Sequence, residues 1–238
     1  MKITRAGRVY QLGFLPRVFP VNCYLVEEED GLTLIDAALP YAWRNILQTA
    51  ESIARPIRRI VLTHPHVDHT GALKHLTSLL PDVPVLVSKR DARLLAGDFS
   101  LDDGEPNLPI RGGFDRSLLS LKVHPFQDGE RIGSLLAIAA PGHTPGHTAF
   151  YEEREGILIA GDAFQTRGGA AVSGMLRPLF PFPAWATWSK QKALESACKL
   201  SELDLKWLAV GHGQMLADPL PAMRKAIDAA TRAGVSEQ

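Results

Sequence analysis

The sequence lacks the features that mark a secreted, disulfide-bonded or membrane-spanning chain. Its 238 residues include only two cysteines, Cys23 and Cys198, which are too few for a disulfide framework and favour a reducing compartment. The segment Met1–Arg8 has no apolar core of an export signal, and no apolar run approaches the length of a membrane span. From these absences we expect a soluble cytoplasmic protein without a membrane partner.

The chain also lacks a charge imbalance. Its 26 basic and 26 acidic residues give a formal net charge of zero with histidine neutral. No electrostatic argument therefore favours nucleic acid or an anionic membrane surface, and we expect neither as a partner. A hydrophobic content of 45% is ample for one sizeable core, so we expect a single domain over residues 1–238. A homodimer is compatible with this composition.

Apolar periodicity predicts strands and helices in succession, followed by a mostly stranded region. An apolar run that ends in turn residues is typical of a buried strand, and apolar residues at three- and four-residue spacing are typical of a helix. The expected strands are Val9–Leu15, Asn22–Val26, Leu32–Asp36, Arg58–Leu62, Val83–Val87, Leu118–Val123, Glu130–Ile132, Leu135–Ala140, Thr148–Glu152, Gly156–Ala160 and Trp207–Val210. The expected helices are Pro40–Ile53, 71–80, Ser88–Ala96 and Asp218–Ala233, with Ser88 as an N-cap.

The densest group of chemically active side chains lies between the expected strand Arg58–Leu62 and the helix that follows it. It contains His64, His66, Asp68 and His69 within six residues. In an extended segment the first two histidines point to one side, because side chains alternate with period two, so they can bind one ion. The other two lie where the chain turns and can hold a second ion, with the carboxylate as a hard oxygen donor. This pattern predicts a metal site; the alternative is a polar loop in which histidines occur by chance.

Three further strand ends carry residues of the same kind. His143 follows the expected strand Leu135–Ala140, in a segment rich in glycine and proline. Asp162 and His212 each follow a later apolar strand. Each residue alone is a weak signal, but side chains at strand ends can converge on one edge of a sheet. Together with the histidine-rich loop they predict one shared site.

This set of residues resembles the metal-ligand set of the metallo-β-lactamase superfamily, in its branch of small stand-alone hydrolases such as glyoxalase II and the lactonases. The resemblance covers nearly the whole chain. It implies an α/β protein with a four-layer αββα sandwich, in which two mixed β-sheets are flanked by helices and the metal site lies at one edge.

The resemblance also implies how the ligands are shared between two divalent ions. The first ion would be bound by His64, His66 and His143. The second ion would be bound by Asp68, His69 and His212, and both ions would be bridged by Asp162. Zinc is the expected metal, with iron or manganese as alternatives. Asp36 matches a family aspartate after an early strand, where it would support a ligand; a role in introducing the helix at Pro40 is equally compatible with its position.

Two such ions lower the pKa of a shared water, so that hydroxide exists at neutral pH. The expected function is hydrolysis of a small ester, lactone or thioester by metal-bound hydroxide, with a small molecule as substrate. Asp68 is the candidate catalytic residue that steers the nucleophile and passes on a proton. The alternative is a mononuclear iron-dependent oxidoreductase of the persulfide dioxygenase type; β-lactamase and phosphodiesterase activities are less favoured.

Two segments are interpreted as active-site loops or a lid. Residues 97–117 carry many acidic, glycine and proline residues without periodicity, and loops of this length are commonly functional. Residues 164–188 include Met175, Leu176, Phe180, Phe182, Trp185 and Trp188. They could form an apolar wall or lid over the metals, with a packed loop or a dimer contact as the alternative. Arg167 and Arg177 in the same segment could meet an anionic substrate group.

The remaining histidines and both cysteines are interpreted as structural. His75 is expected on a helix surface or in helix packing, and His124 in a loop. His147 is expected to form a hydrogen bond near the site rather than to bind metal. Cys23 and Cys198 are expected in the core, on a strand and on a helix face respectively.

Overall fold

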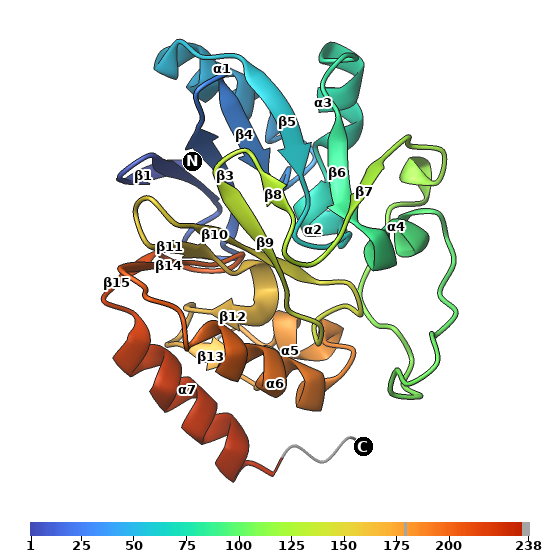
Figure 1. The fold of residues 1–238 in the computed structure, drawn as a ribbon, viewed down its shortest axis with the longest axis vertical. Coiled ribbons are helices and arrows are strands. Elements are labelled where there is room, and N and C mark those ends of the chain that lie inside the picture. Colours follow the sequence, from blue (N-terminus) through green and yellow to red (C-terminus); the bar gives the residue numbers. More distant parts are fainter. Residues whose placement is uncertain (179, 235–238) are drawn as a thin grey trace.

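The computed structural model describes residues 1–178 and 180–234, in which two β-sheets pack face to face between two layers of helices (Figure 1). The first sheet has the order β1-β2-β3-β4-β5-β6-β7, so neighbours in space are also neighbours in sequence. Strands β1 to β4 are antiparallel, and β4 to β7 are parallel. Their bounds are Lys2–Ala6, Val9–Phe14, Val21–Glu27, Leu32–Ile35, Ile57–Val61, Val85–Ser88 and His124–Phe126.

The second sheet has the order β15-β14-β11-β10-β9-β8 and is also mixed. Its pairs are antiparallel except for β11 and β14, which run parallel. The strands from β8 to β11 are Arg131–Ile132, Leu135–Ala139, Thr148–Glu152 and Ile157–Ile159, and β14 and β15 are Trp207–Ala209 and Leu216–Ala217. A separate short pair is formed by β12 (Phe164–Gln165) and β13 (Ala171–Val172).

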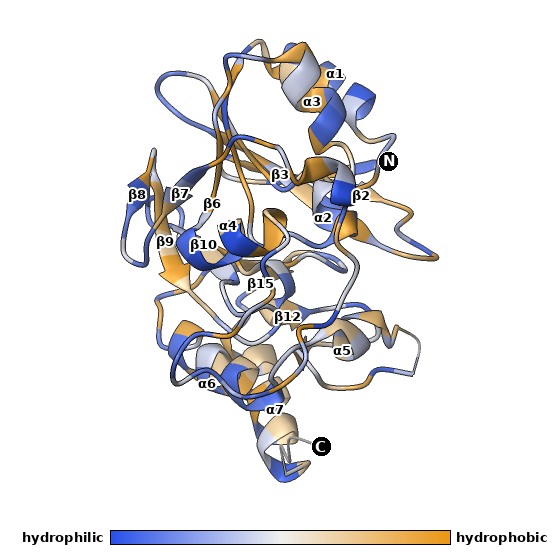
Figure 2. Ribbon diagram, turned by 90° about the vertical axis from the view of Figure 1, so that its right-hand side faces the viewer, coloured by the Kyte–Doolittle hydropathy of each residue, from blue (hydrophilic) through white to orange (hydrophobic). Residues whose placement is uncertain are grey.

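Helices cover the outer face of each sheet, and Figure 2 shows hydrophobic and hydrophilic residues mixed along them. On the first sheet lie α1 and α3, and on the second lie α6 and α7 (Figure 1). The helix bounds are Trp43–Ile53 for α1, Val67–Thr70 for α2, Leu73–Leu79 for α3, Lys89–Leu95 for α4, Phe182–Ala186 for α5, Lys190–Leu200 for α6 and Leu220–Arg232 for α7. The short 3-10 helices η1 and η2 span Arg116–Leu118 and Gly161–Ala163.

The burial of β3 shows why the sequence folds into layers. Successive side chains of a strand point to opposite faces, and both faces of β3 are covered. Cys23 and Leu25 pack toward α1 and α3, whereas Tyr24 and Val26 pack into the core between the sheets. A strand buried on both faces therefore reads as a continuous apolar run. The predicted sandwich of two mixed sheets flanked by helices is confirmed.

Most predicted elements appear within a few residues of their expected bounds, but the prediction around residue 120 was wrong. Residues 118–123 do not form a strand; η1 ends at Leu118 and the edge strand β7 begins only at His124. His124 is thus a strand residue, not a loop residue. The following Pro125 lacks a backbone N–H, which an edge strand tolerates because its outer side needs no ladder partner.

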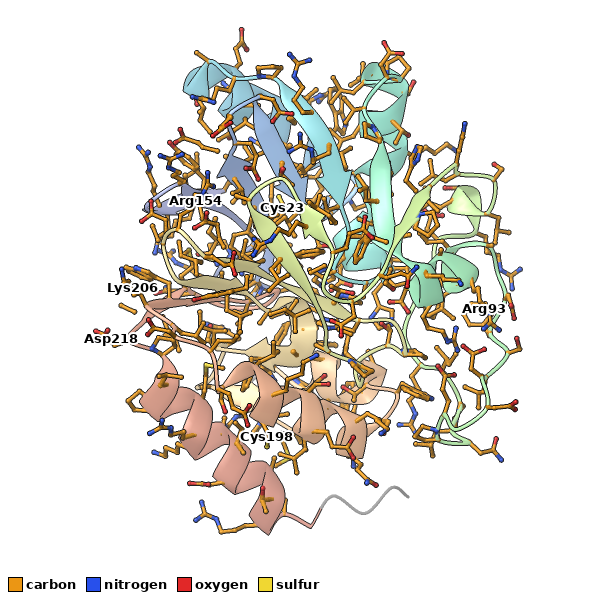
Figure 3. The ribbon with its side chains drawn as sticks, viewed as in Figure 1. Cys23, Arg93, Arg154, Cys198, Lys206 and Asp218 are labelled. Carbon is orange, nitrogen blue, oxygen red and sulfur yellow. The ribbon has the colours of Figure 1, made fainter. Side chains whose placement is uncertain are left out.

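The prediction that Cys198 lies in the core was also wrong, because this side chain is exposed on α6. The buried face of α6 is formed by Ala193, Ala197 and Leu200, and Cys198 lies one residue further round the helix. Cys23 is buried as predicted. Figure 3 shows the two thiols in different layers, and both are free. His75 is exposed and stacks on Trp43 with ring centroids 5.7 Å apart, which confirms its role in helix packing.

None of the helices in residues 1–178 and 180–234 combines the length and apolar character that a membrane span requires.

A buried aspartate ties the two halves of the sandwich together. Asp91 lies on α4, whose N-cap is Ser88 as predicted, and is fully buried. Its carboxylate accepts hydrogen bonds from the hydroxyl of Thr144 at 2.6 Å and from the backbone N–H of Gly146 at 2.8 Å, both in the β9–β10 loop. Burial raises the pKa of Asp91 to about 7, although these two donors oppose the shift. Arg90 also opposes it, and Glu105 adds to it.

The raised pKa of Asp91 predicts a pH-dependent stability. Because the folded pKa lies above the unfolded value of 3.8, the contribution of Asp91 to the free energy of unfolding is complete below that value and is lost as the pH rises through about 7. Asp91→Asn should therefore become more stable relative to the wild type between about pH 4 and about pH 7, as measured by urea denaturation. The exposed Asp82→Asn is the matched control. A difference for Asp91→Asn that stays constant with pH would contradict this prediction.

Candidate metal centre

The seven side chains singled out by the sequence come together at one edge of the sandwich. His64 follows β5, and the next three belong to the loop and helix α2. His143, Asp162 and His212 follow β9, β11 and β14 of the other sheet. Three groups have their ligand atoms within 4.8 Å of one another: His64, His66 and His143; His64, His69 and Asp162; and Asp68, His69 and His212. All are buried except Asp68, whose side chain is 22% exposed.

In the first group, hydrogen bonds to the surrounding protein determine which ring nitrogen is free. His66 Nε2 lies 2.9 Å from the carbonyl oxygen of Arg111. A carbonyl can only accept, so Nε2 carries the proton and His66 Nδ1 is a bare lone pair. That lone pair lies 3.0 Å from His143 Nε2. His143 Nδ1 is in turn 3.1 Å from the hydroxyl of Ser173 and 3.3 Å from that of Thr187. An imidazole nitrogen that carries a lone pair can bind a metal ion, and the spacing of His66 Nδ1 and His143 Nε2 suits two ligands of one ion.

The second group is oriented in the same way. His212 Nδ1 donates to the carbonyl oxygen of Pro20 at 2.6 Å, so in the neutral ring Nε2 carries the lone pair. His212 Nε2 lies 3.4 Å from Asp68 Oδ2. His69 Nδ1 lies 2.8 Å from Asp36 Oδ2, so its Nε2 also faces the cluster.

Asp162 lies between the two groups. Its Oδ2 is 3.1 Å from His212 Nε2 and 3.3 Å from His143 Nε2, and its Oδ1 is 3.4 Å from His69 Nε2. The carboxylate of Asp162 thus contacts imidazoles of both groups, namely His143 of the first group and His69 and His212 of the second. Gly211, next to His212, allows this approach, because a Cβ there would overlap Asp162 Oδ1.

Several inward-facing atoms lack an ordinary partner. Within the described part of the chain, His64 Nε2, His69 Nε2 and Asp162 Oδ1 are buried and form no hydrogen bond. Leaving buried polar atoms unpaired is costly, and a native structure rarely does so without an ion or ligand. These unpaired nitrogen and oxygen atoms are of the types that divalent ions prefer as ligands, so they fit a metal centre.

The electrostatics of the cluster also favour a cation. Burial lowers the pKa of His64, His66 and His143, so these imidazoles are neutral and able to act as ligands. Burial alone would also lower the pKa of His69 and His212, but nearby carboxylates, above all Asp162, raise it instead. The surroundings of Asp162 therefore stabilise positive charge.

Asp36 supports the cluster from outside. Its Oδ1 accepts from the backbone N–H of Thr63 at 2.8 Å, and its Oδ2 accepts from the Thr63 hydroxyl at the same distance. That hydroxyl lies 3.0 Å from His64 Nδ1. Asp36 thus orients His69 directly and His64 through Thr63. It does not introduce the helix after Pro40, because α1 begins at Trp43 and no side chain caps it. Of the two roles left open by the sequence, the structure supports the first.

His147 forms a hydrogen bond beside the site, as predicted. Its Nε2 accepts from the backbone N–H of Asp162 at 3.0 Å. Burial lowers the pKa of His147 to about 4, so the ring remains neutral and able to accept. Sequence reasoning did not identify the other supporting groups, which are the carbonyls of Pro20 and Arg111, the hydroxyls of Ser173 and Thr187, and the carboxylate of Asp91. A backbone carbonyl carries no sequence signal, and an isolated serine or threonine carries very little.

A cavity of ≈ 460 Å³ opens beside the cluster. Both segments interpreted as active-site loops contribute to it, residues 97–117 through Gly112 and Gly113 and residues 164–188 through α5. The two segments are joined by a hydrogen bond from Trp188 Nε1 to the carbonyl oxygen of Leu108 at 3.1 Å. Gly112, with a φ of +101°, packs so closely on His66 that a Cβ would overlap the ring. A lid movement is not tested by this geometry and stays a prediction.

The chain is similar to several known proteins over most of its length. It is 50% identical over 98% of its residues to the uncharacterized protein YobT of Bacillus subtilis, all of which is covered. It is 29% identical to the probable metallo-hydrolase YflN of the same organism, over 81% of this chain and 80% of that protein. It is also 27% identical to a hydroxyacylglutathione hydrolase of Legionella pneumophila, over 61% of this chain and 49% of that protein.

Solved structures are also similar to this chain over most of its length. The structure of TTHA1623 in a di-iron-bound form superposes with a TM-score of 0.65 at 27% identity, over 89% of this chain and 96% of that one. The metallo-beta-lactamase DIM-1 superposes with a TM-score of 0.72 over 98% of each chain, and at 14% identity this likeness shows the fold alone. The sequence profile of the metallo-beta-lactamase superfamily matches residues 16–212. The chain belongs to the metallo-β-lactamase superfamily and is an enzyme of its metallo-hydrolase type.

Proposed function

We propose that this protein uses two divalent metal ions to hydrolyse a small ester, lactone or thioester. The observation that carries the proposal is the convergence of five imidazoles and two carboxylates in three overlapping groups. A single ion needs about four ligands, and this donor set is large enough for two.

The proposed ligand assignment follows these groups. The first ion is held by His64, His66 and His143. The second is held by Asp68, His69 and His212. Asp162 would serve both ions, which is supported by its contacts with imidazoles of both groups. Zinc is the proposed metal, because three-histidine and histidine–carboxylate sets suit it. Iron is a specific alternative, because a similar structure is described in a di-iron-bound form.

Metal ions in this position would activate water and polarise the oxygen of the bond to be cleaved. The residues of the chain then have distinct tasks. The outward N–H groups of the histidines keep each ring in one tautomer and one orientation. Asp68 is the cluster residue that is both partly exposed and part of the cavity wall. Its carboxylate is therefore placed to orient the attacking water and to accept its proton, as a catalytic residue as well as a ligand.

An acyl substrate is supported by the hydroxyacylglutathione hydrolase among the relatives, of which this chain covers about half. The mononuclear iron oxidoreductase is less well supported, because it leaves the group of Asp68, His69 and His212 without a task. We propose a small-molecule substrate that enters through the cavity beside Asp68.

Removing ligands should abolish both metal binding and turnover. We expect His66→Ala and Asp162→Ala to lower the metal content and to reduce hydrolysis by about 100-fold or more, because each removes a donor that no neighbour replaces. Metal analysis would accompany assays of esters, thioesters and lactones, with phosphodiesters and β-lactams as comparators, in zinc, manganese and iron. His75→Ala, an exposed histidine outside the cluster, is the control. Unchanged turnover in both ligand variants would refute the assignment, and one iron per chain with oxygen uptake would favour the oxidoreductase.

Asp36→Asn should weaken metal binding without removing a ligand. The amide cannot accept from both the Thr63 pair and His69 as the carboxylate does, so His69 loses its fixed orientation. We expect the affinity for the second ion to fall by about 10- to 100-fold while the first ion is less affected. Competition with a chromogenic chelator measures both affinities. The exposed Asp82→Asn is the matched control, and equal affinities in Asp36→Asn and wild type would contradict the role given to Asp36.

A further inference from the structure

The cavity beside the metal cluster has one aromatic wall. Its lining residues outside the cluster are mainly apolar: Phe19, Val67, Gly112, Gly113, Phe182, Pro183, Trp185 and Ala186. Gly112 and Gly113 contribute only backbone to this lining. A volume of ≈ 460 Å³ is within the range of small-molecule sites, so the space is large enough for more than an acetyl group.

The aromatic wall is a packed cluster rather than a set of isolated side chains. Phe19 contacts Phe182 with ring centroids 4.9 Å apart, and Phe182 contacts Trp185 at 5.7 Å. Phe180 lies behind them and contacts both Phe19 and the ring of His212 at 5.1 Å. The wall thus continues directly from a proposed metal ligand into the cavity.

The wall is also tied to the other end of the cluster. Thr187, at the end of α5, donates to the carbonyl oxygen of Pro183 at 2.7 Å and lies 3.3 Å from His143 Nδ1. The backbone N–H of Trp188 donates to the carbonyl oxygen of His143 at 3.0 Å. Proline at both Pro181 and Pro183 restricts the backbone of this segment. The aromatic wall is therefore preformed at a fixed distance from the reacting centre.

Three residues that line the cavity are large apolar side chains with much of their surface exposed to water. Trp185 is 62% exposed, Phe182 is 47% exposed and Val67 is 43% exposed. Large apolar side chains gathered around a cavity mark a binding surface. Burying them against a ligand is favourable in proportion to the apolar area removed from water.

The charges around the cavity also bear on which substrates fit it. Among the described residues, no lysine or arginine lines the cavity. Arg167 lines a different cavity together with Lys2, and Arg177 donates to the carbonyl oxygen of Ala170, so neither meets the expectation of an anion contact at this site. An anionic group on the substrate, placed against the aromatic wall, would lose its hydration without gaining a partner.

We propose that the substrate carries an uncharged, apolar group of several carbons, which packs against Phe19, Phe182 and Trp185 while the bond to be cleaved lies at the metal cluster. This specificity rests on the proposed hydrolase function. It makes Phe19, Phe182 and Trp185 the specificity-determining residues and excludes substrates whose carboxylate or phosphate would lie on the wall.

The test uses the metal-loaded enzyme and two series of thioesters, one with acyl groups from acetyl to octanoyl and one with thiols of increasing length. In the series whose lengthened group packs on the wall, we expect kcat/KM to rise about threefold for each added methylene. A hexanoyl thioester should exceed its adipoyl counterpart, which ends in a carboxylate, by about tenfold or more. Trp185→Ala should reduce turnover of the octanoyl or long-thiol substrate by about tenfold, and that of the acetyl substrate by a much smaller factor.

Matched variants separate this role from general damage. Trp185→Phe should retain the preference for long neutral groups, and Trp185→Arg should raise turnover of the adipoyl thioester while lowering that of the hexanoyl one. Leu176→Ala removes an exposed apolar side chain of the same segment that does not line the cavity, and should leave both preferences intact. Calorimetric titration with hexanamide and with adipamate, its carboxylate-bearing analogue, measures the same preference without turnover.

The outcomes distinguish this inference from the function on which it rests. Hydrolysis that is independent of chain length, of the added carboxylate and of Trp185 would overturn the specificity and leave the hydrolase function intact. Tighter, Trp185-dependent binding of hexanamide without hydrolysis of any ester, thioester or lactone would overturn the hydrolase function and support the wall.

Discussion

The structure depends on one constraint: the histidines of the cluster donate their outer N–H groups to the protein and so turn lone pairs toward a common centre. Pro20 and Arg111 provide carbonyls that can only accept, and Asp36 provides a carboxylate. These contacts choose the tautomers before any ion binds. Lone pairs and carboxylates held this close repel one another unless positive charge lies between them. The fold thus holds nitrogen and carboxylate ligand atoms close together, in surroundings that favour positive charge.

The sandwich makes this arrangement possible because its two sheets end at the same edge. The loop with His64 follows β5, which lies between the parallel strands β4 and β6. In the other sheet, His143, Asp162 and His212 follow β9, β11 and β14. Asp91 then links α4 of one half to the β9–β10 loop of the other. The distance between the two sets of ligands is thus set by the packing of the sheets, which resists change because interiors are densely packed.

Much of this could be predicted from sequence because the signals were local. Alternation in an extended segment predicts that His64 and His66 point to one side, and apolar runs ending in histidine or aspartate mark the other strand ends. The errors have physical causes as well. Pro125 suggested a loop, but an edge strand accommodates it. Cys198 follows the buried Ala197 by one residue, and a rotation of about 100° along the helix moves it into solvent. The carbonyls that orient the histidines were out of reach, because any residue can supply one.

The two segments that had no regular pattern in the sequence turn out to form the walls of the cavity. Residues 97–117 contribute the glycines beside His66. Ion pairs of Arg90 with Glu105 and of Arg93 with Asp98 hold them to α4, and Figure 3 labels Arg93. Residues 164–188 contribute the aromatic wall, and Trp188 joins the two. The same contacts that orient the candidate ligands therefore shape the space in which a substrate would lie.

The central claim is that two cations lie within this cluster. Anomalous diffraction from crystals of the zinc-loaded protein, recorded on both sides of the zinc absorption edge, tests it directly. We expect two peaks about 3.5–4 Å apart, with Asp162 between them and three histidines around one of the two. A single peak, or peaks away from His64, His143, Asp162 and His212, would contradict it.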